Sequence, residues 1–336
     1  METEMAIDQD IPNGNSSENT SGEEFASETT ILEISEDGSV HLPEGVTLSQ
    51  GNVEHSGSDL IITQDDGSKI TVEDYFASDN PPSIQTADGG HIPGDLVETL
   101  AGPVAPGQVA DAGNAIGAQP IGHIDKVDGE VVAIRADGTE VELNVGDPIY
   151  QGDVLKSGDD GAVGVVLADD TTFSMANNGE MVLDEMVYDP GTQEGSMDVS
   201  IVKGVFTFVS GQIAKTDPDA MTLDTPVATI GIRGTQVGID FSDGKTLTTA
   251  LMEEADGFVG EIVVTNNGGQ QIINVAGQGT TVTAYENPPS EIFAINDPQI
   301  IDLFGPALRY LPTEIGTGYD YGTQEGLEGE EDENTA

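Results

Sequence analysis

The chain has 336 residues, of which 62 are Asp or Glu and only nine are Lys or Arg, so its formal charge at pH 7 is −53. A protein this acidic repels phosphate groups, which argues against a nucleic-acid partner and against binding to anionic membranes. Cysteine is absent, which excludes disulfides, zinc–thiolate sites and cysteine nucleophiles, while 43 glycines and few aromatic residues favour an all-β core rich in turns.

The N-terminal segment, residues 1–29, is acidic, rich in Ser, Thr and Asn, and nearly free of large apolar side chains. Such a composition cannot bury enough apolar surface to fold, so it predicts disorder. The segment also lacks the basic and apolar regions of an export signal, and no run of 18 apolar residues exists that would predict a transmembrane helix. The chain is therefore expected to be cytoplasmic, or exported by a route without an N-terminal signal.

Residues 30–76 predict a small β-hairpin unit of about four strands. Alternating apolar residues flank Asp37-Gly38 and Asp66-Gly67, and Asp-Gly between two such runs is a strong signal for a tight hairpin. A unit this small is marginally stable alone, so it is expected to pack on another part of the chain. Residues 77–118 are rich in Pro and Gly and are predicted to be a linker.

Residues 119–288 predict the main β domain, because short apolar runs rich in Val, Ile and Thr alternate there with turn signals. A strand pair is expected around Gly204, with Phe206 and Phe208 on one face. The spacing fits a sandwich, a barrel or a β-solenoid, and the repeated turn glycines favour the solenoid. Three further hairpin turns are predicted at Asp137-Gly138, Asp243-Gly244 and Asn267-Gly268.

The last two segments differ from the β domain in composition. Residues 289–312 have apolar residues at mixed helical spacing, with Pro298 suited to a helix start and Pro306 to a break, so one or two short helices are expected to cover an edge of the β domain. Residues 313–336 form an acidic tail that is predicted to be disordered.

Motifs for catalysis are absent from the sequence, so the chain is predicted to be non-enzymatic and to need no cofactor. No G-x-S-x-G, P-loop or H-E-x-x-H pattern occurs, and the four histidines precede most of the main β domain. Asp-rich turns could bind Ca²⁺ weakly, although none has the spacing of an EF-hand loop. The histidines are His41, His55, His91 and His123, and the candidate turns hold Asp159, Asp160, Asp169 and Asp170.

Residues 225–235, TPVATIGIRGT, place one of the nine cations, Arg233, inside an apolar strand. The apolar alternation changes phase after Gly234, which predicts a bulge or a tight bend there. Arg233 would then lie at the bend, half-buried or buried, and its guanidinium could bind backbone carbonyls or a carboxylate such as Asp224. The alternative is that Arg233 contacts an anion or a protein partner.

This stretch resembles the FecR-domain family, in which a Thr-Pro-x-Ala segment precedes Val/Ile-Arg-Gly-Thr. The corresponding residues here are Thr225, Pro226, Ala228, Ile232, Arg233, Gly234 and Thr235. The segments GDVLKSGDDGAVGVVLADDTTFSM and VKGVFTFVSG are similar to the strands that precede this motif in the family, so the resemblance covers about 150–240. It implies a small, solenoid-like, all-β domain without a catalytic centre, in which the motif residues are structural.

The sequence departs from the iron-transport regulators that the FecR-domain family includes. The resemblance to those regulators would imply a helical segment that touches a sigma factor, followed by one membrane span and a periplasmic domain. Neither of the first two is visible here. Residues 121–158 are similar instead to the N-terminal modules of large bacterial surface proteins exported by type I secretion, which are often acidic and free of Cys.

Three functions follow as hypotheses. The first is a non-enzymatic module that is exported or displayed on the cell surface and binds a protein partner. The second is periplasmic signal transduction of the FecR type, acting on a sigma factor. The third is an enzyme with carboxylates facing each other across a cleft, which would require a polar cleft that no sequence motif indicates.

Overall fold

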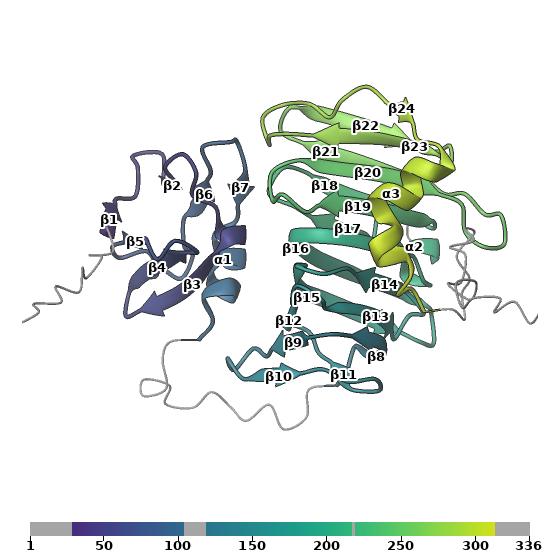
Figure 1. Cartoon of the computed structure of the whole chain (residues 1–336), viewed down its shortest axis with the longest axis horizontal. Helices are drawn as coiled ribbons and strands as arrows, with labels where there is room; N and C mark the ends of the chain where they lie inside the picture. Colours follow the sequence, from purple (N-terminus) through teal and green to yellow (C-terminus); the bar gives the residue numbers. More distant parts are fainter. Residues whose placement is uncertain (1–28, 104–118, 217–218, 313–336) are drawn as a thin grey trace, which may run out of the picture.

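The computed structural model describes residues 29–103, 119–216 and 219–312, and the terminal segments predicted to be disordered lie outside these ranges, apart from Thr29. Residues 29–103 form what we call the N-terminal unit, and residues 119–312 form a larger two-layered β domain (Figure 1). The fold is all-β, as predicted, and the few helices are short.

The N-terminal unit contains two small sheets and a helix around one core. The first sheet has the order β1-β5-β4-β3 and the second has the order β2-β6-β7. Their buried side chains, which include Leu60, Ile62, Tyr75 and Ile84, form one cluster. The elements are β1 Thr29–Leu32, β2 Ser39–His41, η1 Leu48–Gln50, β3 Gly51–Ser56, β4 Asp59–Gln64, β5 Lys69–Val72, β6 Ser83–Gln85, β7 His91–Ile92 and α1 Gly94–Ala101.

Two predictions for this region were wrong. Asp37-Gly38 does form a turn, with Gly38 at a φ of 79°, but the flanking strands do not pair with each other: β1 runs parallel to β5, and β2 runs parallel to β6. Residues 83–101, assigned to a linker from their Pro and Gly content, form β6, β7 and α1. The hairpin at Asp66-Gly67 is present as the antiparallel pair β4–β5.

The β domain consists of two sheets, which we call sheet I and sheet II, stacked around a common core (Figure 1). The order in sheet I, deduced from the pairings, is β11 Pro148–Ile149, β8 Gly122–Asp128, β13 Ala162–Leu167, β14 Thr172–Met175, the second half of β16 Glu194–Val209, β19 Gln236–Phe241, β20 Leu247–Met252, β23 Gln278–Val282 and β24 Phe293–Ala294.

Sheet II consists of the strands that lie between those of sheet I in the sequence, and its strands follow one another in the same direction along the stack. Its order is β10 Glu140–Glu142, β9 Val131–Ile134, β12 Val154–Ser157, β15 Glu180–Asp189, the first half of β16, β17 Met221–Asp224, β18 Thr229–Arg233, β21 Glu261–Asn266 and β22 Gly269–Ile273. The chain thus passes back and forth between the sheets as it advances along the stack, which is a solenoid-like progression of a two-layered sandwich.

One long strand, β16, belongs to both sheets. Its first half pairs with β15 and β17, and its second half pairs with β14 and β19. Gly204 separates the two halves with a φ of 128°, which residues with a Cβ rarely adopt. The predicted strand pair around Gly204 is therefore a single bent strand. The predicted turns at Asp137-Gly138, Asp243-Gly244 and Asn267-Gly268 each join two antiparallel strands.

Two helices flank the sandwich, α2 Ile213–Thr216 and α3 Asp297–Leu308. Helix α3 begins at a capping box formed by Asn296 and Gln299, with Pro298 in its first turn, and Pro306 lies inside it rather than ending it. It crosses the outer face of sheet I (Figure 1), where Phe304 packs with Val209, Ala250 and Met252. The segment 289–312 is thus a cover, but over a sheet face and not only over an edge.

Helix α3 lies over a row of small residues that runs straight across sheet I. We call this set the small-residue row. Successive pairings align its members from strand to strand, and an added Cβ would meet Phe304 at Gly238, Tyr310 at Gly164 and Ile295 at Gly279. The absence of large side chains lets the segment 295–312 approach the backbone of the sheet. The row consists of Gly164, Ser174, Thr207, Gly238, Ala250 and Gly279.

Candidate functional site

The segment 225–235 begins as a tight turn between β17 and β18. The hydroxyl of Thr225 accepts a hydrogen bond from the Ala228 backbone N–H at 3.0 Å and donates one to the Ala228 carbonyl at 2.7 Å. Pro226 at the tip of this turn has no N–H to leave unpaired. The Thr-Pro-x-Ala pattern is therefore a self-capped turn that presents the Pro226 carbonyl outward.

Arg233 ends β18 on the outer face of sheet II, where it joins two acidic side chains. Its Nη1 lies 2.5 Å from Oε1 of Glu261, the residue paired with it on β21, and its Nη2 lies 2.7 Å from Oδ1 of Asp219. These two hydrogen bonds, that of Asp219 first, raise the pKa of Arg233 above its ordinary value. The side chain is 33% exposed, which makes it half-buried.

The prediction that Asp224 is a carboxylate partner of Arg233 was wrong, because Asp224 binds the hydroxyl of Thr229 instead. Asp224 and Arg233 lie at opposite ends of the β17–β18 hairpin, so they cannot meet. Sequence reasoning could not have favoured Glu261 or Asp219 among 62 acidic residues, because the pairing depends on the register between β18 and β21.

Gly234 and Thr235 form the corner where the chain leaves sheet II for sheet I. Gly234 has a φ of 61°, and both the preceding Ile232 and the following Val237 point into the same core. Thr235 is fully buried; its N–H donates to the Ser210 hydroxyl at 2.7 Å, and its hydroxyl donates to the Met252 carbonyl at 3.2 Å. The change of apolar phase in the sequence therefore marks a crossing between sheets.

The Pro226 turn is also where the N-terminal unit docks on the β domain. The His91 N–H donates to the Pro226 carbonyl at 2.7 Å, and the Tyr285 N–H donates to the Gly89 carbonyl at 2.8 Å. The rings of His91 and Tyr285 stack, with their centroids 4.8 Å apart. Gly89 and His91 lie in 77–118, the segment that had been predicted to be a linker, and Pro226 lies in the family motif.

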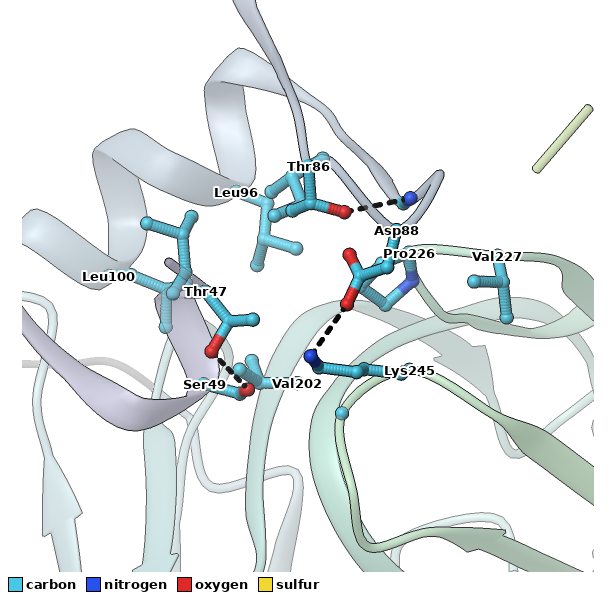
Figure 2. A pocket seen from close by; sticks show the side chains of 14 residues that line it. Thr47, Ser49, Thr86, Asp88, Leu96, Leu100, Val202, Pro226, Val227 and Lys245 are labelled. Carbon is cyan, nitrogen blue, oxygen red and sulfur yellow. Dashed lines mark hydrogen bonds and ion pairs between the residues drawn. The ribbon is translucent and has the colours of Figure 1, made fainter. Parts of the chain in front are cut away.

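Two lysines of the β domain strengthen this contact. Lys245 Nζ lies 2.9 Å from Oδ2 of Asp88, as Figure 2 shows, and Lys203 Nζ donates to the Ser49 carbonyl. Apolar side chains gather in the same region, with Leu96 and Leu100 of α1 on one side and Val202 on the other (Figure 2). The N-terminal unit is therefore attached to the outer face of sheet II by both polar and apolar contacts.

Beside the Pro226 turn, residues of the two parts line an acidic cavity of about 490 Å³ that is open to solvent. Asp184, Asp198 and Asp224 line it from sheet II, and Asp95 lines it from α1. The pKa of Asp184 is raised to about 6, mainly by burial and also by the charges of Asp224 and Asp95, although hydrogen bonds from Ser200 act to lower it. Burial likewise raises the pKa of Asp224. The cavity therefore brings together carboxyl groups whose simultaneous ionisation is unfavourable.

Among the residues that the structure describes, no group of His, Asp or Glu has an arrangement that could hold a metal ion. The candidate turn residue Asp169 is fully buried and accepts hydrogen bonds from Thr171 and from the Ile213 N–H. Asp170 follows it at a φ of 68° within the same turn, and Asp159 and Asp160 occupy another turn. Turn formation thus accounts for Asp169 and Asp170.

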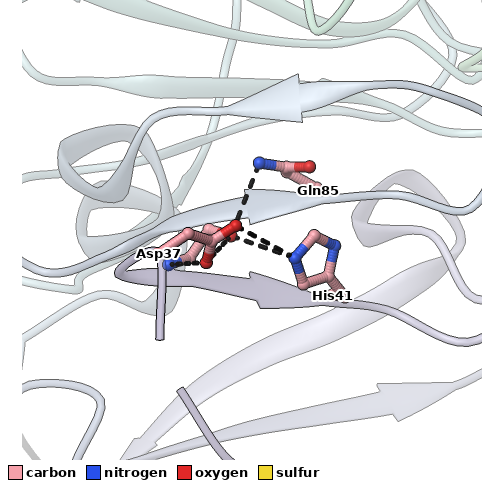
Figure 3. Close-up of polar contacts among 4 residues, drawn as sticks. Asp37, His41 and Gln85 are labelled. Carbon is pink, nitrogen blue, oxygen red and sulfur yellow. Dashed lines mark hydrogen bonds and ion pairs between the residues drawn. The ribbon is translucent and has the colours of Figure 1, made fainter. Parts of the chain in front are cut away.

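One Ser, His and Asp grouping does exist, in the N-terminal unit (Figure 3). Ser39 Oγ lies 2.8 Å from Oδ1 of Asp37 and 3.2 Å from Nε2 of His41, and the same Nε2 lies 3.5 Å from Oδ2 of Asp37. A catalytic triad requires the carboxylate and the hydroxyl on opposite ring nitrogens. Here both approach Nε2, and Ser39 is already bound to the carboxylate, so the grouping cannot relay a proton from serine to histidine.

The other histidines have separate environments. His55 stacks on Phe76 with the ring centroids 3.6 Å apart, and burial lowers the pKa of His55. His91 belongs to the docking contact, and His123 lies on β8 as an exposed residue. In the described part of the chain, no two histidines are brought together with a nucleophile.

Comparison with known proteins identifies the domain. Residues 153–254 match the family model described as "FecR protein", so the chain contains a FecR domain there. This range includes all the motif residues predicted from the sequence, from Thr225 to Thr235, and begins at the buried Asp153 that forms an ion pair with Arg135. No sequence among the curated proteins matched the chain.

Two solved structures are similar to the chain over part of its length. Both are crystal structures, at 1.65 and 2.50 Å resolution, of a protein from Parabacteroides distasonis ATCC 8503 described as a candidate anti-sigma factor. Each is 10% identical, with a TM-score of 0.34, and the match covers 44% of this chain and 62% of that one. The chain thus aligns with less than two thirds of those proteins. Within the residues described here, no helix is long and apolar enough to cross a bilayer.

Proposed function

We propose that this protein is a non-enzymatic signalling protein, in which the FecR domain is the module that binds a protein partner. The observation that supports this most directly is the FecR match over 153–254, combined with the docking of the N-terminal unit on the motif turn at Pro226. Asp37, Ser39 and His41 are not arranged as a catalytic triad.

The arrangement suits regulation because both outer faces of the FecR domain are covered by the chain itself. The N-terminal unit packs on sheet II through Val154 and Val182, and α3 packs on sheet I through Phe304. A partner that competes with either cover would change the conformation of the chain, and such competition is a simple physical basis for a signal. We place the protein in the periplasm, where FecR-type signalling would expose this domain to a receptor.

The test is to delete the gene in its native host, restore it on a plasmid, and measure the transcript profile together with the location of the protein. A signalling protein should change a restricted set of transcripts, and the restored gene should reverse that change. The protein itself should be found in the periplasmic fraction. An unchanged transcript profile in all conditions that express the gene would contradict the proposal.

A second function is favoured by one observation, the combination of a formal charge of −53 with the absence of Cys. Such a composition suits a structural or interaction module that is exported through a type I system or displayed on the cell surface. The same experiment separates the two functions, because this module would appear in the culture medium or on the surface and would leave the transcripts unchanged.

A further inference from the structure

The face of sheet I beneath α3 contains polar side chains that the helix does not satisfy. Ser174 and Thr207 belong to the small-residue row, and both are fully buried. Among the residues that the structure describes, neither hydroxyl has a hydrogen-bond partner, and the same holds for the side chains of the neighbouring Thr172 and Gln236. Buried polar groups are nearly always paired, so a set of four on adjacent strands is unusual.

The position of the row explains why these hydroxyls are covered. Ser174 and Thr207 lie between Gly164, which faces the Tyr310 carbonyl, and Gly238, which faces the Phe304 ring. The part of the chain from Phe304 to Tyr310 therefore passes over them. Its buried side chains there are apolar, since Ala307 and Leu308 are both almost completely inaccessible to solvent.

The polar contacts of the cover lie at its margin instead. Lys126 Nζ donates to the Leu311 carbonyl at 2.5 Å, and the Tyr310 hydroxyl donates to Asp128 at 3.0 Å. Pro306 also removes one backbone hydrogen bond inside α3, which weakens the helix. The cover is thus matched to the row in shape, through Phe304 over Gly238, but not in hydrogen bonding.

We propose that the small-residue row is a helix-binding groove, that α3 occupies it as an exchangeable cover, and that a partner protein displaces α3 with a helix bearing hydroxyl or amide side chains opposite Ser174 and Thr207. The helix geometry follows from α3 itself, which is already seated in the groove. The polar requirement follows from the unpaired hydroxyls. This inference goes beyond the proposed function, because the groove would serve a signalling protein and an exported module equally.

The first measurement is hydrogen–deuterium exchange of the full chain, followed by mass spectrometry. In an exchangeable cover, residues 297–312 should exchange at least about tenfold faster than β16 and β19. The double variant Ser174→Ala and Thr207→Val removes the unpaired hydroxyls and should slow that exchange by about threefold or more. Thr265→Val, on an exposed position of sheet II, is the matched control and should have no effect.

The second measurement uses a fluorescent peptide with the sequence of residues 296–312 and a second peptide carrying Ala307→Ser. Each is titrated into the full chain with Phe304→Ala, which loosens the cover, and Phe304→Leu replaces that variant if it does not fold. The serine peptide should bind at least about threefold tighter, by one added hydrogen bond. Its advantage should disappear when Ser174→Ala and Thr207→Val are also present.

Two results would overturn the inference. One is exchange of residues 297–312 as slow as that of β16 and unaffected by the double variant, which would mean that buried water satisfies the hydroxyls under a permanent cover. The other is equal binding of both peptides, which would mean that the hydroxyls do not select the occupant. Neither result depends on the transcripts, so this inference and the proposed function can fail separately.

Discussion

At the scale of single residues, the scarce cations join separate elements of the fold. Arg135 pairs with Asp153, Lys156 with Glu180, Lys215 with Glu254 and Lys245 with Asp88. Arg233 joins two acidic residues from different segments, 219 and 261. In a chain with 62 acidic residues, a cation relieves local repulsion wherever it lies. These five cations therefore lie at points where two segments of the chain are joined.

Arg233→Ala should lower the free energy of unfolding by about 1–2 kcal/mol, because Glu261 and Asp219 lose their common partner. The value is modest because the arginine is one-third exposed and solvent screens the pairs. Urea unfolding measures it, with Lys69→Ala on an exposed position of β5 as the control. An unchanged midpoint together with an altered transcript profile would show that Arg233 binds a partner instead.

Asp184 should make stability depend on pH. Its pKa is about 6 in the folded chain against an ordinary 3.8, so the folded state binds the proton more tightly. The protein should therefore be most stable below about pH 4 with respect to this group, and should lose stability as the pH rises through 6. Asp184→Asn should remove that loss and add about 2 kcal/mol at pH 7.5.

The measurement is urea unfolding between pH 4 and 7.5, with Asp159→Asn as the control, because Asp159 is an exposed turn residue. If the free energy of unfolding changes with pH in the same way for the wild type and for Asp184→Asn, the acidic cavity does not bury the Asp184 carboxylate. Since Asp95 of the N-terminal unit also faces the cavity, acid should strengthen the docking of that unit as well.

At the scale of elements, the seating of α3 depends on glycines that are far apart in the sequence. An added Cβ at Gly238 would lie 2.7–2.8 Å from the ring atoms of Phe304, so the helix would have to move. Gly238→Ala should therefore destabilise the protein by about 1–3 kcal/mol and expose residues 297–308 to hydrogen exchange. Gly231→Ala is the control, because its Cβ would meet nothing closer than 3.9 Å.

Hydrogen exchange localises the effect of Gly238→Ala, and urea unfolding gives its size. If the variant is as stable as the wild type and residues 297–308 remain protected, Phe304 is not seated on the sheet as the structure places it. A loss of stability without faster exchange in α3 would place the strain within β19 instead.

Elements whose signals are local could be predicted, and those that depend on pairing could not. The turns at Asp66-Gly67 and Asp243-Gly244 were predictable because the turn residues and both strands are contiguous. The pairing of β1 with β5 was not, because parallel partners are remote in sequence. The strands β6 and β7 were missed because they are only three and two residues long.

For the candidate site too, features with local sequence signals could be predicted, and features that depend on tertiary contacts could not. The motif from Thr225 to Thr235 could be recognised and its bend at Gly234 inferred, because both depend on neighbouring residues. The docking contact at Pro226 could not, because it needs the positions of Gly89 and His91, which lie more than a hundred residues away. The acidic cavity likewise assembles carboxylates from three strands and a helix.

At the scale of the whole molecule, the two lysines at the docking contact should control how the N-terminal unit is held. Lys203→Met and Lys245→Met together should weaken docking by about 1 kcal/mol, because partly exposed pairs contribute little each. Small-angle scattering should then report a larger radius of gyration, and α1 should exchange faster. Lys69→Met, within the N-terminal unit, is the control.

If the double variant keeps the wild-type radius and the same protection of α1, the apolar contacts of Leu96 and Leu100 are sufficient and the lysines are dispensable. If the N-terminal unit instead unfolds when released, its core depends on Val154 and Val182 of the β domain. Unfolding would agree with the sequence-based expectation that so small a β unit must pack on something else.

The sequence by itself determined the composition-dependent properties of this protein: an all-β fold, the absence of thiol chemistry, the position of most turns and the presence of a FecR motif. These follow from local preferences, because turn residues and apolar alternation act over a few positions. Only the tertiary structure decided which strands pair, which face the N-terminal unit covers and how α3 is seated on six small residues. Those outcomes depend on register, and register is set by the packing of strands that are distant in the chain.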